Sequence, residues 1–277
     1  MCRMFAYVGA PVWLDSLLIE PSSSLVSQSM AAREAKTVVN GDGCGIGWYG
    51  EREAPGLYRD IHPAWSDPNL ASLCRQIRSG LFLAHVRSAT SGEVSRANCH
   101  PFALGRTLFM HNGQIGGYER VRRHIDALIP DRLYPARRGT GDSEAIFLAA
   151  AGRGLAERPV AAIAETLALC CRHMTEAGIS QPLRFSALLS DGDRLHAFRW
   201  ASDAHPPSLY WASVGGGIAV ASEPFSFEAG AWTPVPAGSV LIADGSDVRI
   251  APFSPEAAAP AGAAAEREPG QGSAAAA

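Results

Sequence analysis

The second residue of the chain, Cys2, could supply both a nucleophile and a base. Removal of Met1 would leave Cys2 with a thiol and a free α-amine on one residue. An α-amine titrates at about pH 7.7–8.0, whereas a lysine amine titrates near ~10.4, so a sizeable fraction of the α-amine is an unprotonated base at neutral pH. A thiol beside such a base is suited to nucleophilic catalysis. The alternative is a cysteine that merely lies near a terminus.

Two later clusters could bind the polar parts of a small substrate. In the segment 84–92, Arg87 offers a planar guanidinium that suits a carboxylate, although an arginine at a strand end is often a structural ion-pair residue. In the segment 109–115, a sharp turn at Gly113 would expose the Asn112 amide and the Gly113 N–H. Two donors that converge on one point can form an oxyanion hole. The same tripeptide, His111-Asn112-Gly113, is equally compatible with an ordinary turn.

Two further clusters each allow two interpretations. Asp142, within the segment 140–144, either caps a helix or receives an ammonium group from a ligand. The glycine-rich segment 40–49 could cradle a phosphate, but no Gly-Lys-Ser/Thr follows it. This segment therefore favours a tight turn and a strand that other backbone approaches closely.

Secondary-structure patterns around these clusters predict helices and antiparallel sheets. Helical spacing and capping residues indicate helices at 22–35, 67–79, from Asp142 onward, and at 158–177. Short runs rich in β-formers predict strands at 81–87, 107–111, 184–190, 194–200, 209–213, 217–222 and 239–243. Because most strands follow one another directly, the sheets should be antiparallel, with helices on their outer faces.

Composition limits the class of protein and the compartment. The chain has 277 residues, of which 47% are apolar, and a net charge of −3, which gives no case for nucleic-acid binding. We expect one domain at 1–253 and a disordered Ala/Pro/Gly-rich tail at 254–277. No segment predicts a signal peptide or a membrane span, so a cytoplasmic location is expected. The six cysteines include no CxxC pair and predict neither a disulfide frame nor a metal site.

The order of the clusters along the chain resembles that of the class II glutamine amidotransferases, which are N-terminal nucleophile hydrolases. The resemblance rests on Cys2 and on the segments 42–49, 85–87, 98–102, 111–113 and 142–144. It covers the chain from Cys2 to about Ala150 and extends through 220–225 and 232–236. The opening Met1-Cys2-Arg3 is most similar to the branch that hydrolyses γ-glutamyl amides in ergothioneine biosynthesis. The resemblance implies an α+β fold, a four-layer αββα sandwich of two antiparallel sheets.

The resemblance also implies roles for individual residues and no cofactor. Cys2 would attack a γ-glutamyl amide, and its own amine would move the proton. Asn112 and Gly113 would hold the oxyanion. Arg87 would bind the α-carboxylate and Asp142 the α-ammonium of the glutamyl group. The further substrate-binding residues implied are Ser88, Thr90 and His111.

The chain departs from the family pattern at the pocket wall. Many synthase-linked members have Arg-Trp-Ala-Thr-His-Gly where this chain has Arg-Ser-Ala-Thr-Ser-Gly at 87–92. The expected substrate is glutamine or a small γ-glutamyl conjugate. The alternatives are a glutaminase subunit that delivers ammonia to a separate synthase partner, and a non-catalytic glutamine sensor. The loop arginines Arg132, Arg137 and Arg138 could favour an anionic leaving group, but a solvated loop is the preferred interpretation.

Overall fold

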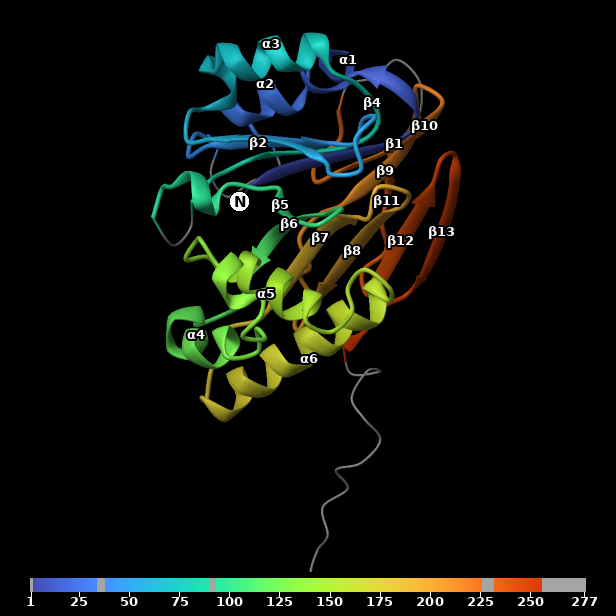
Figure 1. Cartoon of the computed structure of the whole chain (residues 1–277). Helices are drawn as coiled ribbons and strands as arrows, with labels where there is room; N and C mark the ends of the chain where they lie inside the picture. The colour runs from blue at the N-terminus through green and yellow to red at the C-terminus, as the bar shows by residue number, and fades with distance from the viewer. Residues whose placement is uncertain (1, 34–37, 90–92, 226–231, 256–277) are drawn as a thin grey trace, which may run out of the picture.

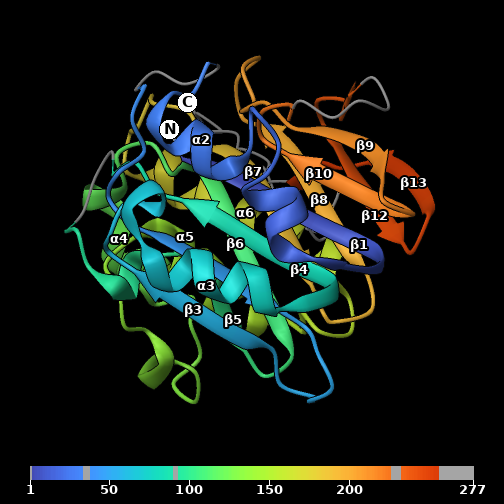
Figure 2. The same cartoon turned by 90° about the horizontal axis from the view of Figure 1, so that it is seen from above.

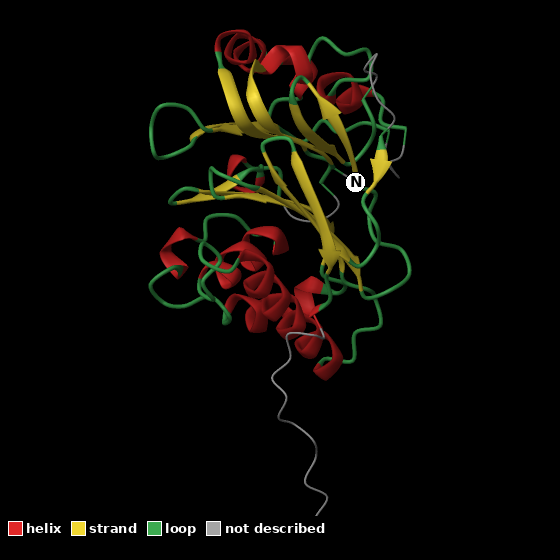
Figure 3. Cartoon of the chain, turned by 90° about the vertical axis from the view of Figure 1, so that its right-hand side faces the viewer, coloured by secondary structure: helices red, strands yellow, loops and turns green. Residues whose placement is uncertain are grey.

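Two antiparallel sheets lie face to face, and helices cover the outer face of each sheet (Figures 1 and 3). The computed structural model describes residues 2–33, 38–89, 93–225 and 232–255. Within these residues the layers are ordered helix, sheet, sheet, helix. The four-layer αββα sandwich expected from the resemblance is therefore confirmed.

The first sheet is built around the N-terminal strand. In the described residues its strand order is β11-β9-β10-β1-β4-β2-β3, and β1 pairs antiparallel with both β4 and β10. The bounds are β1 Arg3–Trp13, β2 Cys44–Trp48, β3 Gly56–Asp60, β4 Arg78–Val86, β9 Tyr210–Val214, β10 Gly217–Ala221 and β11 Thr233–Pro234.

The second sheet carries the central strand pair β6 and β7. Its order in the described residues is β13-β12-β8-β7-β6-β5. The bounds are β5 Phe102–Leu104, β6 Thr107–Gln114, β7 Arg184–Ser190, β8 Leu195–Ala201, β12 Ser239–Asp244 and β13 Asp247–Pro252. Every strand predicted from the sequence has a counterpart in one of the two sheets, with ends that differ by at most three residues.

Side chains alternate along β1, and both faces of this strand are buried. Met4, Ala6 and Val8 pack between the two sheets, whereas Phe5 and Tyr7 pack beneath the first helical layer. A strand that is covered on both faces is encoded as a continuous apolar run rather than as an alternating pattern. This explains why β1 was absent from the predicted strands.

In the described part of the chain, three helices cover each sheet on its outer side. Figure 2 looks down onto the first group, which lies across the strands of the first sheet. This group is α1 Leu14–Leu18, α2 Leu25–Met30 and α3 Pro68–Gln76, and the group on the second sheet is α4 Tyr118–Asp126, α5 Asp142–Ala151 and α6 Pro159–Glu176. Short 3₁₀ turns occur at Ala64–Ser66, Arg96–Asn98 and Tyr134–Ala136. No helix in the described ranges is long and apolar enough to cross a membrane.

Several predicted helix boundaries need correction. The helix predicted at 22–35 is only the short α2, capped by Ser24, and part of the predicted range lies outside the described residues. The helix predicted at 67–79 starts after its Asp67 cap, as expected, but ends at Gln76 because the chain enters β4. Helices α1 and α4 were not predicted. The division into a domain at 1–253 and a tail stays a prediction, since residues 256–277 lie outside the described ranges.

Candidate active site

Cys2 lies where the start of β1 meets the end of β4. The register of these strands pairs Arg3 with Val86, which brings Cys2 beside the residues that follow β4. The Ser88 N–H donates to Cys2 Sγ over 3.4 Å, and the Sγ–H group faces the Ser88 carbonyl oxygen at 3.5 Å. The sulfur is therefore held by backbone polar groups in a half-buried position.

The surroundings of Cys2 favour a neutral thiol. Burial raises the pKa of the Cys2 thiol, and the Ser88 N–H and the Arg87 charge oppose this rise only in part. In the part of the chain that the structure describes, no side chain hydrogen-bonds to Sγ. Among the described side chains, therefore, none is a base hydrogen-bonded to the thiol.

Asn112 links the second sheet to the nucleophile. Its side-chain Nδ2 donates to the Cys2 carbonyl oxygen over 3.0 Å, so the amide points between the sheets toward Cys2. The sharp turn predicted at Gly113 was wrong, because β6 continues to Gln114. Gly113 is required for a different reason: a Cβ at this position would overlap the Arg184 carbonyl oxygen on β7. The pairing of β6 with β7, rather than a turn, therefore fixes the backbone conformation of Asn112 and Gly113.

Arg87 is buried with part of its guanidinium unused. Its Nη2 donates to the Glu93 carbonyl oxygen over 3.3 Å, while the buried Nη1 has no hydrogen-bond partner among the described residues. No carboxylate within the described ranges forms an ion pair with it, contrary to the structural ion-pair interpretation. An unpaired buried N–H of a guanidinium is costly unless an anion binds there. Arg87 therefore has the local chemistry of a carboxylate-binding residue.

Asp142 is the first residue of α5 and not its cap. The N-cap is Gly141, and Asp142 Oδ2 accepts a hydrogen bond from the Ile115 N–H over 2.8 Å. This bond fixes the carboxylate against the end of β6. An ionised carboxylate accepts several hydrogen bonds, so Asp142 retains capacity for an ammonium group.

His111 is held by two hydrogen bonds on the helical side of the second sheet. Nε2 lies 3.3 Å from the Arg184 carbonyl oxygen, and Nδ1 lies 2.8 Å from the Ser143 hydroxyl. Because a carbonyl can only accept, Nε2 carries the proton, and Nδ1 is then an acceptor for the Ser143 hydroxyl. The single hydrogen of that hydroxyl is shared between Nδ1 and Asp142 Oδ1, which lies 3.3 Å from the Ser143 oxygen. Burial lowers the pKa of His111, which keeps this ring neutral. His111 is a fixed neutral support for the neighbouring residues.

A single cavity of about 170 Å³ brings together most of the predicted site residues. It is lined by Cys2, Arg87, Ser88, His111, Asn112, Gly113 and Asp142, together with Asn98, His100, Gln114, Ser143 and Arg184 among others. Thr90, the remaining predicted site residue, lies outside the described residues. Pockets for drug-sized ligands measure roughly 300–1,000 Å³, so this cavity suits a small polar ligand. The described residues hold no cluster of His, Cys, Asp or Glu placed to bind a metal ion.

Buried histidines near the cavity are neutral at pH 7. The rings of His85 and His100 lie tilted against each other with centroids 4.3 Å apart, and neither ring has a hydrogen-bond partner among the described residues. Burial lowers the pKa of His85 to about 3 and that of His100 well below its usual value. Among the lining residues, the cationic side chains are therefore Arg87 and Arg184, and the anionic one is Asp142.

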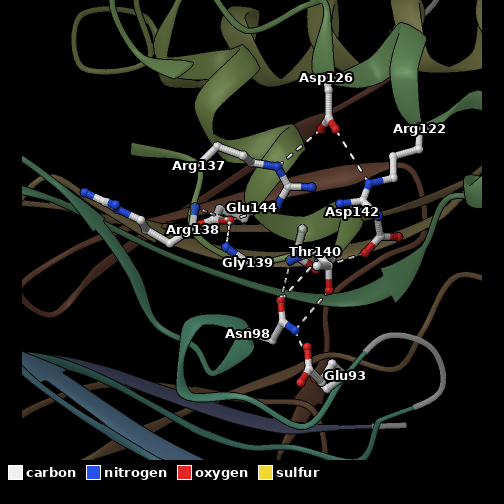
Figure 4. Close-up of polar contacts among 12 residues, drawn as sticks. Glu93, Asn98, Arg122, Asp126, Arg137, Arg138, Gly139, Thr140, Asp142 and Glu144 are labelled. Carbon is white, nitrogen blue, oxygen red and sulfur yellow. Dashed lines mark hydrogen bonds and ion pairs between the residues drawn. The ribbon is translucent and has the colours of Figure 1, made fainter. Parts of the chain in front are cut away.

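Asn98 joins the two charged sides of the cavity, and it was not among the predicted site residues. Figure 4 shows its side chain between Glu93 and Thr140. Oδ1 accepts from the N–H groups of Thr140 and Gly141, at 2.8 and 3.3 Å, and Nδ2 donates to the Glu93 carbonyl oxygen at 2.9 Å and to Thr140 Oγ1 at 3.2 Å. That same Glu93 oxygen receives the Arg87 bond, and Gly141 directly precedes Asp142.

A buried ion-pair network fixes the loop that leads into α5 (Figure 4). Arg137 donates to Glu144 over 2.8 Å and to Asp126 over 3.2 Å, and all three side chains are largely buried. Glu144 also accepts the N–H of Gly139 over 2.7 Å. The interpretation of this region as a solvated loop was wrong for Arg137, whose side chain is largely buried in the ion-pair network. Arg132 and Arg138 are exposed and do not line the cavity.

Comparisons with known proteins identify the family of this chain. The family model for class II glutamine amidotransferases matches residues 16–205. The chain is 32% identical to the gamma-glutamyl-hercynylcysteine sulfoxide hydrolase of Mycolicibacterium smegmatis, over 85% of this chain and 92% of that protein. It is 29% identical to the probable glutamine amidotransferase DUG3 of Saccharomyces cerevisiae, over 92% of this chain and 85% of that protein.

Solved structures show the same fold. A glutamine aminotransferase class-II domain protein from Silicibacter pomeroyi superimposes with a TM-score of 0.74 at 38% identity, covering 92% of this chain and 99% of that one. The glutamine phosphoribosylpyrophosphate amidotransferase of B. subtilis superimposes with a TM-score of 0.61 at 14% identity, covering 91% of this chain and 49% of that one. The second likeness supports the N-terminal nucleophile hydrolase fold alone. On the family match and these relatives, the chain belongs to the class II glutamine amidotransferases and is an enzyme of the amidohydrolase type.

Proposed function

We propose that the chain hydrolyses the amide bond of glutamine or of a small γ-glutamyl conjugate, with Cys2 as nucleophile. The observation that carries the proposal is the convergence of Cys2, Asn112, Arg87 and Asp142 on one small cavity. Each of the four supplies a different contact that a γ-glutamyl amide requires. The relatives named as gamma-glutamyl-hercynylcysteine sulfoxide hydrolases support the same substrate class.

A free glutamyl head group presents one carboxylate and one ammonium at a fixed separation. Arg87, with its buried unpaired Nη1, would bind the α-carboxylate, and Asp142 would bind the α-ammonium. Ser88 and Thr90 are proposed as neighbouring contacts to the same group, and His111 as a support for this wall. Because the two charged residues lie on different sides of the cavity, they would select a free amino-acid head group and orient its γ-carbonyl toward Cys2.

The proposed reaction proceeds through a γ-glutamyl thioester. Cys2 Sγ attacks the amide carbon, the thiol proton passes to the Cys2 α-amine, and the oxyanion accepts hydrogen bonds from Asn112 Nδ2 and the Gly113 N–H. Collapse of the intermediate breaks the C–N bond, and the amine returns the proton to the leaving nitrogen. Water, deprotonated by the same amine, then cleaves the thioester to release glutamate and restore the thiol.

The need for the α-amine as base follows from the state of the thiol. Burial raises the pKa of Cys2, and no described side chain hydrogen-bonds to Sγ. A proton acceptor must therefore come from elsewhere, and the amine freed by removal of Met1 is covalently attached to the same residue. Met1 lies outside the described residues, so its removal is part of the proposal.

The proposal is tested by glutamate release from glutamine and from a panel of γ-glutamyl compounds. Cys2→Ala should abolish release while the protein retains its thermal unfolding temperature. Cys171→Ala, at a half-buried cysteine on α6, is the matched control and should retain activity. Glutamate release by Cys2→Ala at the wild-type rate would contradict the proposal.

We infer that the reaction takes place in the cytoplasm, because a thiol nucleophile must stay reduced.

The glutamate-release assay also distinguishes the two alternative functions. A separate synthase subunit is the second proposed arrangement, in which glutaminase activity is weak alone and rises when the partner is added. Glutamine-induced thermal stabilisation without any turnover would instead indicate the non-catalytic sensor.

A further inference from the structure

Arg184 lies beside the proposed oxyanion residue on the face that points toward Cys2. In the β6–β7 pairing, Arg184 is opposite Gln114 and Ser186 is opposite Asn112. Leu188, two positions further along β7 from Ser186, packs between the two sheets. Alternation along the strand therefore directs Arg184 to the inter-sheet side, and Arg184 lines the same cavity as Cys2.

The guanidinium of Arg184 is fixed in place with one edge unused. Nε and Nη2 donate to Asp203 over 3.3 and 2.7 Å, and Asp203 is itself held by the His205 N–H over 3.0 Å. Among the described residues, Nη1 has no hydrogen-bond partner. The side chain is 26% exposed, so it lies at the open rim of the cavity and not in the interior. A guanidinium with such a free edge can bind a second carboxylate.

In the proposed function, Arg184 is a lining residue left for the part of the substrate beyond the scissile bond. In the proposed function, Arg87 and Asp142 hold the glutamyl head group, and Cys2 and Asn112 hold the carbonyl. The polar lining residues not used by these contacts include Arg184 and the exposed Gln114, which are cross-strand neighbours at the cavity mouth. Ammonia, the leaving group from glutamine, has no carboxylate that a guanidinium could bind.

We propose that Arg184, assisted by Gln114, binds a carboxylate on the leaving group. This inference rests on the proposed function and narrows its substrate class. The preferred substrates are γ-glutamyl conjugates whose amine-derived part carries a free carboxylate, such as γ-glutamyl amino acids, in preference to glutamine. Asp203 acts as a positioning residue that orients the guanidinium.

The test compares two substrates that differ only at this carboxylate, γ-glutamyl-alanine and γ-glutamyl-alaninamide. Wild-type kcat/KM should be about ten- to a hundredfold higher for the carboxylate, the range of one charge-assisted contact. Arg184→Gln should remove this preference by lowering the carboxylate value alone. Arg184→Lys should restore part of the preference for the carboxylate substrate. The matched control is Arg194→Gln, at an exposed arginine paired with Asp244, and it should keep the wild-type preference.

Several outcomes would overturn the inference. Equal kcat/KM for both substrates in the wild type would exclude a carboxylate subsite. An equal loss of kcat/KM for both substrates in Arg184→Gln would make Arg184 a structural residue only. If kcat/KM for γ-glutamyl-alaninamide is unchanged in this variant, the variant is folded. Calorimetry can measure the affinity of γ-glutamyl-alanine for the inactive Cys2→Ala protein and for the double variant that also carries Arg184→Gln. An affinity that is the same in both proteins would contradict the proposed carboxylate subsite. Failure of every γ-glutamyl compound to react or bind would instead refute the proposed function itself.

Discussion

Asn98 is the residue whose replacement most sharply tests how the cavity is assembled. The Asn98→Ala change removes the four hydrogen bonds that connect Glu93 with Thr140 and Gly141. The Thr140 hydroxyl can turn to water, but three backbone groups lose a partner. At about 0.5–1.5 kcal/mol for each bond, the free energy of unfolding should fall by about 2–4 kcal/mol.

The same change should weaken substrate binding more than it slows the chemical step. Asn98 connects the Glu93 carbonyl that contacts Arg87 with the loop that leads into Asp142. Without it, the two sides of the cavity must be reordered when substrate binds. If reordering the two sides of the cavity costs about 1.4–2.8 kcal/mol of binding free energy, KM rises about ten- to a hundredfold. Because head-group contacts hold substrate and transition state alike, kcat should change little.

Steady-state kinetics with a hydrolysed γ-glutamyl substrate and thermal unfolding provide the two readouts. Asn98→Asp keeps the acceptor for the Thr140 and Gly141 N–H groups but loses both donor bonds, so its KM should lie between wild type and alanine. Asn69→Ala, at an exposed position on α3, should match wild type in both readouts. An unchanged KM in Asn98→Ala, together with a lower unfolding temperature, would refute this reasoning and leave Asn98 as a purely structural residue.

Three further predictions concern the cavity and its surroundings. Asp142→Ala should raise KM at least tenfold and change a saturated kcat far less, and initial rates that show an unchanged KM would exclude an ammonium contact. Because the buried ring of His85 has a pKa of about 3 while an unfolded histidine titrates near ~6.5, the unfolded state binds more protons between these values. Stability should therefore fall as pH drops from about 6.5 toward 3, by up to ~1.4 kcal/mol per pH unit from this group, and His85→Leu should flatten the slope in urea titrations. Arg137→Met should lower the free energy of unfolding by about 3–5 kcal/mol, since it leaves the buried carboxylate of Glu144 without its cation, and a loss below 1 kcal/mol by denaturant unfolding would contradict a structural role for the pair.

The sequence predicted the elements that carry a local signal. Strands β7 and β8 flank an Asp-Gly-Asp turn, and α3 begins after an Asp-Pro pair, so their existence followed from short patterns. The order of the polar clusters along the chain carried the family resemblance, and that resemblance implied the fold class. Turn chemistry and helix caps are written within a few residues, which is why they could be read directly.

Features that depend on distant pairing were not predicted. The run from Met4 to Val8 is buried on both faces and has no period that separates a strand from a helix. Asn98 acts through groups 42 and 43 residues away, which no local pattern announces. The same holds for Arg137, because its burial depends on α4, whose charged sequence was not predicted as a helix. The roles of the site residues stay predictions.

The most direct test of the central claim is to trap the γ-glutamyl thioester on Cys2. Acid-quenched protein that has been incubated with a hydrolysed γ-glutamyl substrate is digested, and its N-terminal peptide is analysed by mass spectrometry. The account predicts a peptide that begins at Cys2, lacks Met1 and carries one glutamyl group that hydroxylamine removes. Turnover by protein that retains Met1, or a glutamyl group on any other residue, would contradict the claim that Cys2 and its freed amine perform the reaction.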